Sequence, residues 1–85
     1  MSKNKYSAEK ICKLVELKKD KAGIVKKIGS GILAQKLINL GVIPGEKIKM
    51  ITRSPFGDPI IILARGCLVG LSKNMAENIN LCLLN

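Results

Sequence analysis

The chain has 85 residues, 47% of them hydrophobic, and its 15 Lys and Arg residues against 6 Asp and Glu residues give a formal net charge of +9. This length predicts one domain with a small core, and because only Tyr6 and Phe56 are aromatic, that core must be aliphatic. Histidine is absent, which excludes Ser-His-Asp and Cys-His catalysis and the usual histidine-containing metal sites. The longest apolar run, residues 60–71, is too short to span a bilayer, so we expect no membrane insertion.

The positive charge favours an anionic partner, such as nucleic acid, an anionic membrane surface or an acidic protein. Thirteen of the 15 basic residues are lysines, whereas specific phosphate or base recognition favours arginine. Two aromatic residues also provide few stacking platforms for single-stranded nucleic acid. Solvated lysines that keep a small protein soluble are therefore the simpler interpretation.

Residues 1–8 are polar and basic without periodicity, which predicts a flexible tail before a domain over 9–85. Ser7 is a candidate N-cap with Glu9 in the first turn of a short helix. The apolar stripe of this helix would contain Ile11, Leu14, Val15 and Leu17.

Residues 23–28 have the branched side chains of a first strand, and the glycines at 29 and 31 let the chain change direction. Over 32–40, the spacing of Leu33, Leu37 and Leu40 predicts one amphipathic helix. Gly41 is its natural left-handed C-terminal residue, with Val42 or Ile43 folding back onto the last turn.

The second half of the chain reads as strands separated by turns. Pro44-Gly45 predicts a type II turn before a strand over 46–53, in which Ile48, Met50 and Thr52 share one face. Residues 54–59 predict a hairpin connection, and 60–64 a strand buried on both faces. Arg65-Gly66 predicts the next turn, and it precedes a strand over 67–71 with a bulge or close approach at Gly70. The chain then continues with a helical turn within 72–77 and a last strand over 79–84.

About five short strands with one inserted helix predict a mainly β fold, a small SH3-like barrel with a short N-terminal helical turn. We expect the last strand to close the sheet on the first and to remove its exposed edges.

The remaining chemistry of the chain is sparse. The carboxylates are scattered rather than paired for acid-base work, and no phosphate-binding glycine motif is present, so we expect no enzyme, catalytic residue or cofactor. A soft-metal site formed by Cys12, Cys67 and Cys82 is one alternative, but cysteines among aliphatic residues commonly act as small hydrophobes. An odd number of cysteines without a close pair, and no recognisable secretion signal, predict a reduced, cytoplasmic protein.

The chain resembles the FeoA family in the order and spacing of its motifs. These are Leu40-Gly41-Val42-Ile43-Pro44-Gly45, Ser54-Pro55-Phe56-Gly57-Asp58-Pro59-Ile60, and the stretch from Arg65-Gly66 to Leu71, and the resemblance covers about residues 14–83. It implies a small cytosolic SH3-like protein of bacterial ferrous iron uptake. Its implied role is a non-catalytic accessory that binds the cytosolic part of FeoB, the membrane GTPase that transports Fe(II).

The resemblance also carries a label of transition-metal binding, although nothing in this sequence supplies an obvious Fe(II) site. Members of the family often have arginines in the helix and at the end of the penultimate strand, where this chain has Ala34-Gln35-Lys36 and Leu71-Ser72.

We expect partner binding at the helix face, with Leu37 and Leu40, and at Arg53, Phe56 and Arg65. Phe56 is either an anchor for a partner or a lid over one end of the barrel. The alternative function is a basic barrel that binds nucleic acid, which would lose affinity steeply with salt. Self-association through an exposed strand stays open.

Overall fold

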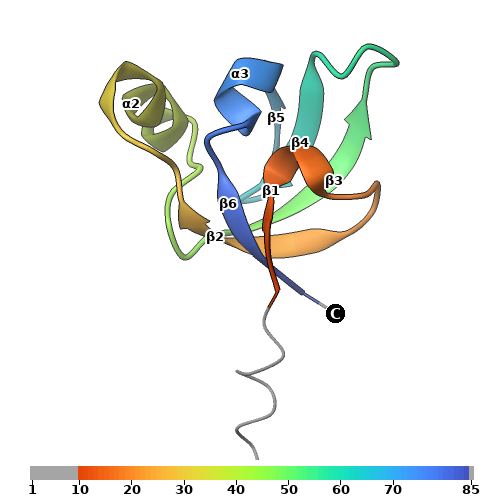
Figure 1. Ribbon diagram of the computed structural model, residues 1–85, viewed down its shortest axis with the longest axis horizontal. Helices are drawn as coiled ribbons and strands as arrows, with labels where there is room; N and C mark the ends of the chain where they lie inside the picture. The colour runs from red at the N-terminus through yellow and green to blue at the C-terminus, as the bar shows by residue number, and fades with distance from the viewer. Residues whose placement is uncertain (1–9, 85) are drawn as a thin grey trace, which may run out of the picture.

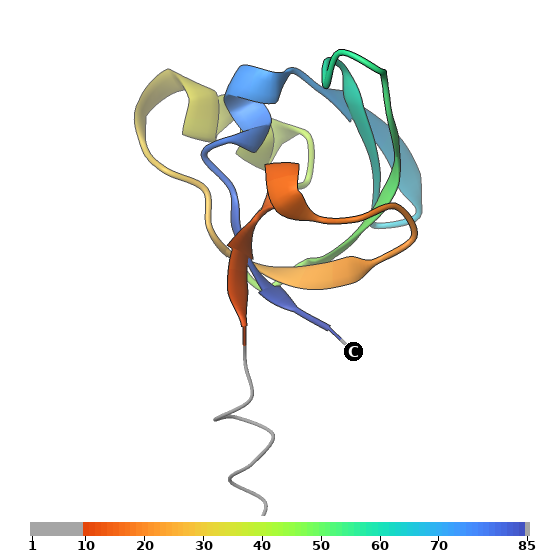
Figure 2. The same cartoon turned by 45° about the vertical axis from the view of Figure 1, so that its right-hand side comes forward.

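The structure is a computed structural model, and it describes residues 10–84. In chain order its elements are β1 (Ile11–Lys13), the 3-10 helix η1 (Leu14–Glu16), β2 (Ala22–Lys27), α2 (Gly31–Asn39), β3 (Lys47–Arg53), β4 (Ile60–Ala64), β5 (Cys67–Leu71), α3 (Lys73–Ala76) and β6 (Asn80–Leu83). The strands form one antiparallel sheet in the order β1-β6-β2-β3-β4-β5. Figures 1 and 2 show this sheet curving around a common interior, with α2 at one side.

Within the described part of the chain the interior is apolar and contains no aromatic side chain, and no polar or charged residue is buried. Every strand except β1 contributes a fully or nearly fully buried side chain, for example Val25, Met50, Ile62, Leu71 and Leu81. The prediction of a mainly β fold with one inserted helix and an aliphatic core is confirmed, although the sheet has six strands within residues 10–84 rather than about five.

The predicted N-terminal helix is wrong between residues 11 and 13. This segment forms strand β1, which pairs with β6 through Ile11 opposite Cys82 and Lys13 opposite Asn80. The predicted helical turn is confirmed at Leu14–Glu16, where it is a single 3-10 turn, and the Glu16 carboxylate accepts a hydrogen bond of 3.0 Å from the amide of Lys13. Pairing with a strand far along the chain overrides the local periodicity. The predicted tail and the Ser7 and Glu9 cap lie outside the described residues.

Helix α2 ends as the sequence predicts. The amide of Gly41 donates to the carbonyl of Ile38 at 2.9 Å, and the amide of Val42 donates to that of Leu37 at 2.9 Å, which together form a Schellman motif. Gly41 has a φ of 91° and Val42 is fully buried. The predicted apolar face of Leu33, Leu37 and Leu40 is only partly correct, because Leu37 is buried and Leu33 half-buried while Leu40, at the C-cap, is 43% exposed.

The two predicted turns flank β3. The amide of Glu46 donates to the carbonyl of Ile43 at 3.0 Å, and Gly45 has a φ of 95°, as a type II turn requires. At the other end, the Ser54 hydroxyl donates to the carbonyl of Asp58 at 2.6 Å and accepts from its amide at 3.0 Å, which closes the loop over 54–59.

Three predictions about the strands are corrected. The register of β3 against β4 shifts between Met50 and Thr52, so Thr52 is exposed rather than inward with Ile48 and Met50. Strand β4 is buried on one face only, since Ile61 is half-buried. The pairing of β4 with β5 is continuous through Gly70, and a Cβ added at Gly70 would meet only Cδ1 of Ile61 at 3.5 Å, so Gly70 marks neither a bulge nor a close backbone approach.

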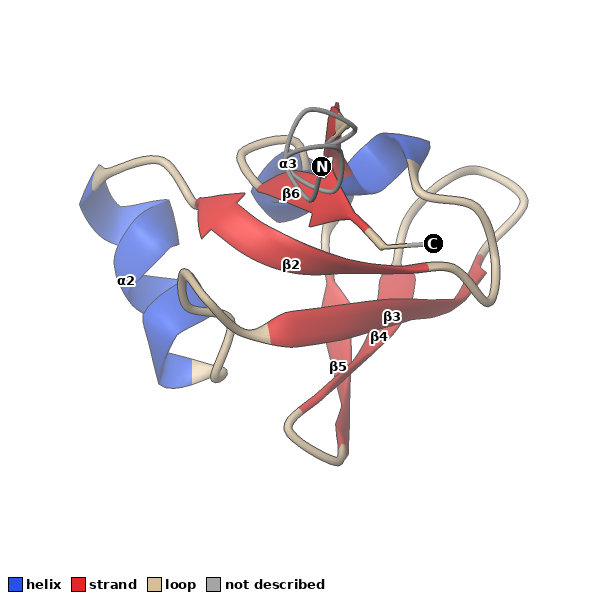
Figure 3. Ribbon diagram, turned by 90° about the horizontal axis from the view of Figure 1, so that it is seen from below, coloured by secondary structure: helices blue, strands red, loops and turns tan. Residues whose placement is uncertain are grey.

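The predicted closure of the sheet is also partly wrong. The pairing of the last strand with the first predicted strand is confirmed, because β6 pairs with β2 through Ile24 opposite Cys82. However, β1 and β5 lie at the two ends of the strand order and each pairs with one neighbour within residues 10–84. The view from below in Figure 3 shows β4 and β5 together at one end of the curved sheet.

Candidate protein-interaction surface

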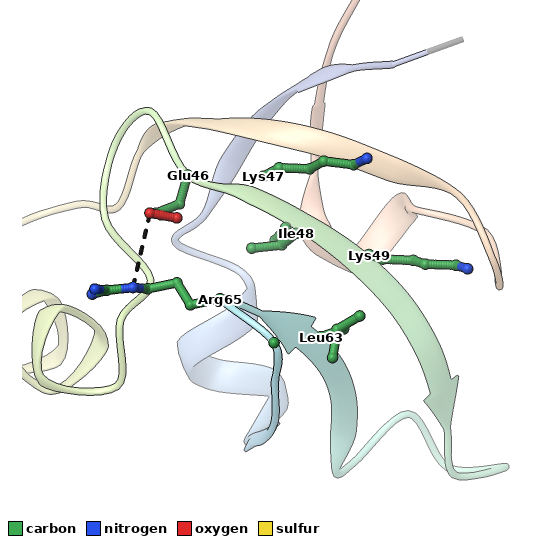
Figure 4. A pocket seen from close by; sticks show the side chains of 7 residues that line it. Glu46, Lys47, Ile48, Lys49, Leu63 and Arg65 are labelled. Carbon is green, nitrogen blue, oxygen red and sulfur yellow. Dashed lines mark ion pairs between the residues drawn. The ribbon is translucent and has the colours of Figure 1, made fainter.

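Arg65 occupies the tip of the two-residue turn between β4 and β5. Arg65 and Gly66 have φ angles of 55° and 79°, the left-handed pair that a type I′ hairpin turn requires. The turn directs the side chain of Arg65 outward, where it is 61% exposed and its Nε lies 4.0 Å from Oε1 of Glu46 (Figure 4). An exposed pair at this distance contributes little to stability, so the guanidinium stays available to a partner.

A depression of about 360 Å³ lies beside Arg65, between the start of β3 and the end of β4. It is lined by the fully buried Ile48 and the half-buried Leu63, and its rim carries Lys47 and Lys49 together with Arg65. Figure 4 shows these side chains around the opening, with both lysines extending along the same side of β3. Three cationic side chains against the single carboxylate of Glu46 give this depression a net positive charge.

A second depression, of about 370 Å³, lies on the other side of Arg65. It separates the end of α2 from the β4–β5 turn, and it presents Ile38 and Leu40, each 43% exposed, opposite Cys67. The side chain of Arg65 packs over Gly41, since a Cβ at Gly41 would lie 3.2 Å from Cδ of Arg65. We call the residues lining the two depressions the Arg65 surface.

The Arg65 surface combines exposed apolar side chains with a basic rim. An apolar centre surrounded by charged residues is the usual anatomy of a protein-binding patch, and the cations favour an acidic partner. The surface contains Leu40 and Arg65 of the five residues predicted from the sequence.

Leu37 was a wrong choice for a contact residue. Its side chain is fully buried in the core, where it helps to fix α2 against the sheet. It supports the neighbouring Leu40 but offers no surface to a partner.

Arg53 is used within the fold. Its guanidinium donates to the carbonyl of Val15 at 2.7 Å and also to the carbonyl of Leu17. These two bonds fasten the η1 segment to the end of β3. Arg53 therefore has a structural role, and it lies at the opposite end of β3 from Lys47.

Phe56 lies in the loop over 54–59 and is 89% exposed. A side chain this exposed covers nothing, so the lid interpretation is wrong. The loop joins the end of β3 to the start of β4, so Phe56 and the Arg65 turn lie at opposite ends of this strand pair (Figure 1). Phe56 stays a candidate anchor, separate from the Arg65 surface.

The cysteines form no metal centre in the described part of the chain. No group of three histidine, cysteine, aspartate or glutamate residues within 10–84 is arranged to hold a metal ion, which contradicts the three-cysteine alternative. Cys12 lines a pocket with Lys18, Lys21 and Glu16. Burial, followed by the effects of Glu16 and of Cys82, raises the pKa of the Cys12 thiol, which opposes its use as a nucleophile.

Sequence reasoning missed most residues of this surface, among them the exposed Ile38 and the charged Glu46, Lys47 and Lys49. The signal for the lysines was present, because alternation along 46–53 already placed both on the outward face of the strand. The exposure of Ile38 could not be predicted from the sequence, because it depends on how α2 is rotated about its axis against the sheet.

Comparison with known proteins gives a consistent result. The family model for the FeoA domain matches residues 12–81. A crystal structure described as the iron uptake regulatory protein FeoA is 32% identical, with a TM-score of 0.81, covering 88% of this chain and 100% of that one. The solution structure of FeoA from Chlorobium tepidum is also 32% identical, with a TM-score of 0.79, covering 87% of this chain and 71% of that one.

A third structure, FeoA from Stenotrophomonas maltophilia in complex with zinc, is 21% identical with a TM-score of 0.71, covering 82% of this chain and 88% of that one. It is described as a prokaryotic SH3-domain protein and a candidate activating factor of ferrous iron transport, and its likeness supports the SH3-like fold. No curated protein matches this chain in sequence. With the family model covering nearly the whole described domain, this chain belongs to the FeoA domain family.

Proposed function

We propose that this protein is a non-catalytic, cytoplasmic accessory of ferrous iron uptake that binds the cytosolic part of a FeoB-type Fe(II) transporter. The observation that carries the proposal is the Arg65 surface, an apolar and basic patch on a chain of the FeoA family. No helix within residues 10–84 is long and apolar enough to cross a membrane.

Binding at the Arg65 surface would act on the transporter by differential affinity. A partner that prefers one nucleotide-dependent conformation of FeoB shifts the transporter toward that conformation by the ratio of the two affinities. The exposed apolar residues Ile38 and Leu40 would supply contact area. The lysines and Arg65 would select an acidic surface and raise the association rate.

Metal binding is not part of the proposal. The Stenotrophomonas maltophilia relative was solved with zinc. Residues 10–84 of this chain contain no group of three His, Cys, Asp or Glu side chains that could hold a metal ion.

The proposal is tested with two variants that lose the same charge. Arg65→Gln removes the guanidinium at the centre of the surface, and Lys19→Gln removes a charge from an exposed loop. We expect Arg65→Gln to bind solubilised FeoB about tenfold more weakly, as a loss of about 1.4 kcal/mol implies, and Lys19→Gln to bind nearly as the wild type. Equal affinities for both variants would exclude the Arg65 surface as the contact.

Phe56 is tested separately. Because the side chain is 89% exposed, Phe56→Ala should leave the free energy of unfolding unchanged within about 0.5 kcal/mol. Weaker FeoB binding by this variant would identify a second contact at the far end of β3 and β4. Unchanged binding would limit the interface to the Arg65 surface.

Nucleic acid binding is the second candidate, because the net charge is +9 and 15 of the 85 residues are Lys or Arg. Within residues 10–84 the only aromatic side chain is Phe56, which leaves little for base stacking. A labelled oligonucleotide that is not shifted at low salt would exclude this function. A shift that falls steeply with salt would support it.

A further inference from the structure

The free edge of β5 lacks the usual protection against pairing with another chain. Strands at sheet edges generally carry lysine or proline, or are very short. Strand β1, at the other end of the sheet, follows this rule with three residues that include Lys13. Strand β5 (Cys67–Leu71) has five residues without charge or proline, and it ends the sheet.

The backbone groups on this edge can be assigned from the turn. Because a two-residue turn joins the strands, Ala64 and Cys67 form a hydrogen-bonded pair, and hydrogen-bonded pairs alternate with non-bonded ones. Leu63 opposite Leu68 and Ile61 opposite Gly70 are therefore the non-bonded pairs. The amides and carbonyls of Leu68 and Gly70 point away from β4, and they form no hydrogen bond with any residue of 10–84.

The side chains beside this edge are apolar and incompletely covered. Leu68 is 67% exposed, and Gly70 is exposed and has no side chain to cover Ile61, which is only half-buried. Near Cys67 the edge opens onto the second depression of the Arg65 surface, where Ile38 and Leu40 stand opposite. An extended segment added to β5 would cover these apolar groups and satisfy the outward backbone groups together.

The flanking charges select the kind of segment. Arg65 precedes β5 and Lys73 follows it, and both are exposed. In the antiparallel register that pairs all of β5 with β5 of a second copy, each Arg65 would oppose Lys73 of the other copy, so like charges would meet at both ends. A partner strand with carboxylates near its two ends would instead place these carboxylates opposite Arg65 and Lys73.

We propose that β5 takes up an extended segment of the partner by strand addition, and that this segment has alternating apolar residues flanked by Asp or Glu. The inference rests on the proposed function, since it describes how the FeoB partner is held at the Arg65 surface. Leu68 and Gly70 would exchange backbone hydrogen bonds with the added strand.

Amide hydrogen exchange of the full chain, with and without solubilised FeoB, tests the proposal directly. We expect the amides of Leu68 and Gly70 to exchange rapidly in the free protein and at least tenfold more slowly in the complex. Saturable FeoB binding that leaves both amides unprotected would overturn strand addition and keep the proposed function. No FeoB binding in any nucleotide state would overturn both. If the amides of Leu68 and Gly70 exchange more slowly when the free protein is concentrated, the strand that pairs with β5 belongs to a second copy. This result would also overturn the proposal.

Substitutions give an independent readout. Leu68→Pro removes one outward amide, and proline is tolerated on an edge strand where the N–H faces away from the sheet. Leu68→Thr shortens the side chain equally but keeps that amide. We expect proline to weaken FeoB binding at least tenfold more than threonine does, with circular dichroism confirming that both variants fold. Equal loss by both variants would assign the effect to the leucine side chain and overturn strand addition.

The charge requirement is tested with a matched pair. Lys73→Glu reverses the charge beyond the end of β5, and Lys19→Glu makes the same change in an exposed loop. We expect Lys73→Glu to bind more weakly at 50 mM salt than Lys19→Glu does. Identical affinities would contradict the acidic flank.

Discussion

Among the glycines of the chain, Gly23 is the one with the least room for a side chain. A Cβ added there would lie 3.0 Å from the carbonyl oxygen of Cys82 and 3.2 Å from Cβ of Leu81, both on the paired strand β6. Gly23 is buried, so Gly23→Ala must push β2 and β6 apart. Overpacking of this kind costs about 1–3 kcal/mol, and the lower entropy of alanine in the unfolded chain returns about 0.4–1 kcal/mol.

We therefore expect Gly23→Ala to lose about 1–2 kcal/mol of unfolding free energy, which lowers the melting temperature by about 4–16 °C in a domain of this size. Gly70→Ala is the matched control on another strand. Its new Cβ would lie 3.5 Å from Cδ1 of Ile61, an ordinary contact, so stability should stay within about 0.5 kcal/mol or rise. Urea unfolding followed by circular dichroism measures both. A Gly23→Ala protein as stable as the wild type would refute the close packing of β2 against β6.

Three further expectations concern single side chains. Arg53→Met should destabilise the protein by about 1–2 kcal/mol, because two backbone carbonyls lose a charged donor. Arg65→Met should cost less than about 0.5 kcal/mol, because the exposed pair with Glu46 contributes little. Urea unfolding measures the stability of both variants. Ser72→Ala should cost about 1 kcal/mol by thermal unfolding, because the Ser72 hydroxyl accepts a 3.1 Å bond from the amide of Met75 at the start of α3. The pKa of the Cys12 thiol is raised in the fold, so stability should be unaffected at low pH and should fall as pH rises above the ordinary thiol pKa, where the unfolded chain ionises first. This alkaline decline should be smaller in Cys12→Ala, and an identical decline in urea unfolding would contradict the raised pKa.

Local signals in the sequence predicted the turns well because the turns are local structures. The structure has left-handed glycines at 41 and 45 and a turn at Arg65-Gly66, which are the positions predicted from the residue types. Each needs only the conformational freedom of a few neighbouring residues.

Long-range pairing could not be read in the same way. Ile11–Lys13 has a helix-compatible pattern, and it becomes a strand because β6 offers it an edge. The bulge that turns Thr52 outward depends likewise on the register of β3 against β4.

The candidate site was predictable only in part for the same reason. Arg65 lies in a turn and carries a charge, and because turns project such residues into solvent, its exposure could be expected from the sequence. The exposure of Ile38 and the burial of Leu37 depend on how α2 is rotated against the sheet, which spacing alone does not define. The bonds from Arg53 to Val15 and Leu17 join residues far apart in the sequence, so its structural use was not visible.

The central claim is that this member of the FeoA family acts by binding a FeoB-type transporter. The most direct test is a titration of the purified protein against solubilised FeoB from the same cell at moderate salt, with GDP, with a non-hydrolysable GTP analogue, and without nucleotide. We predict saturable binding whose affinity depends on the nucleotide. The absence of binding in all three states would contradict the claim.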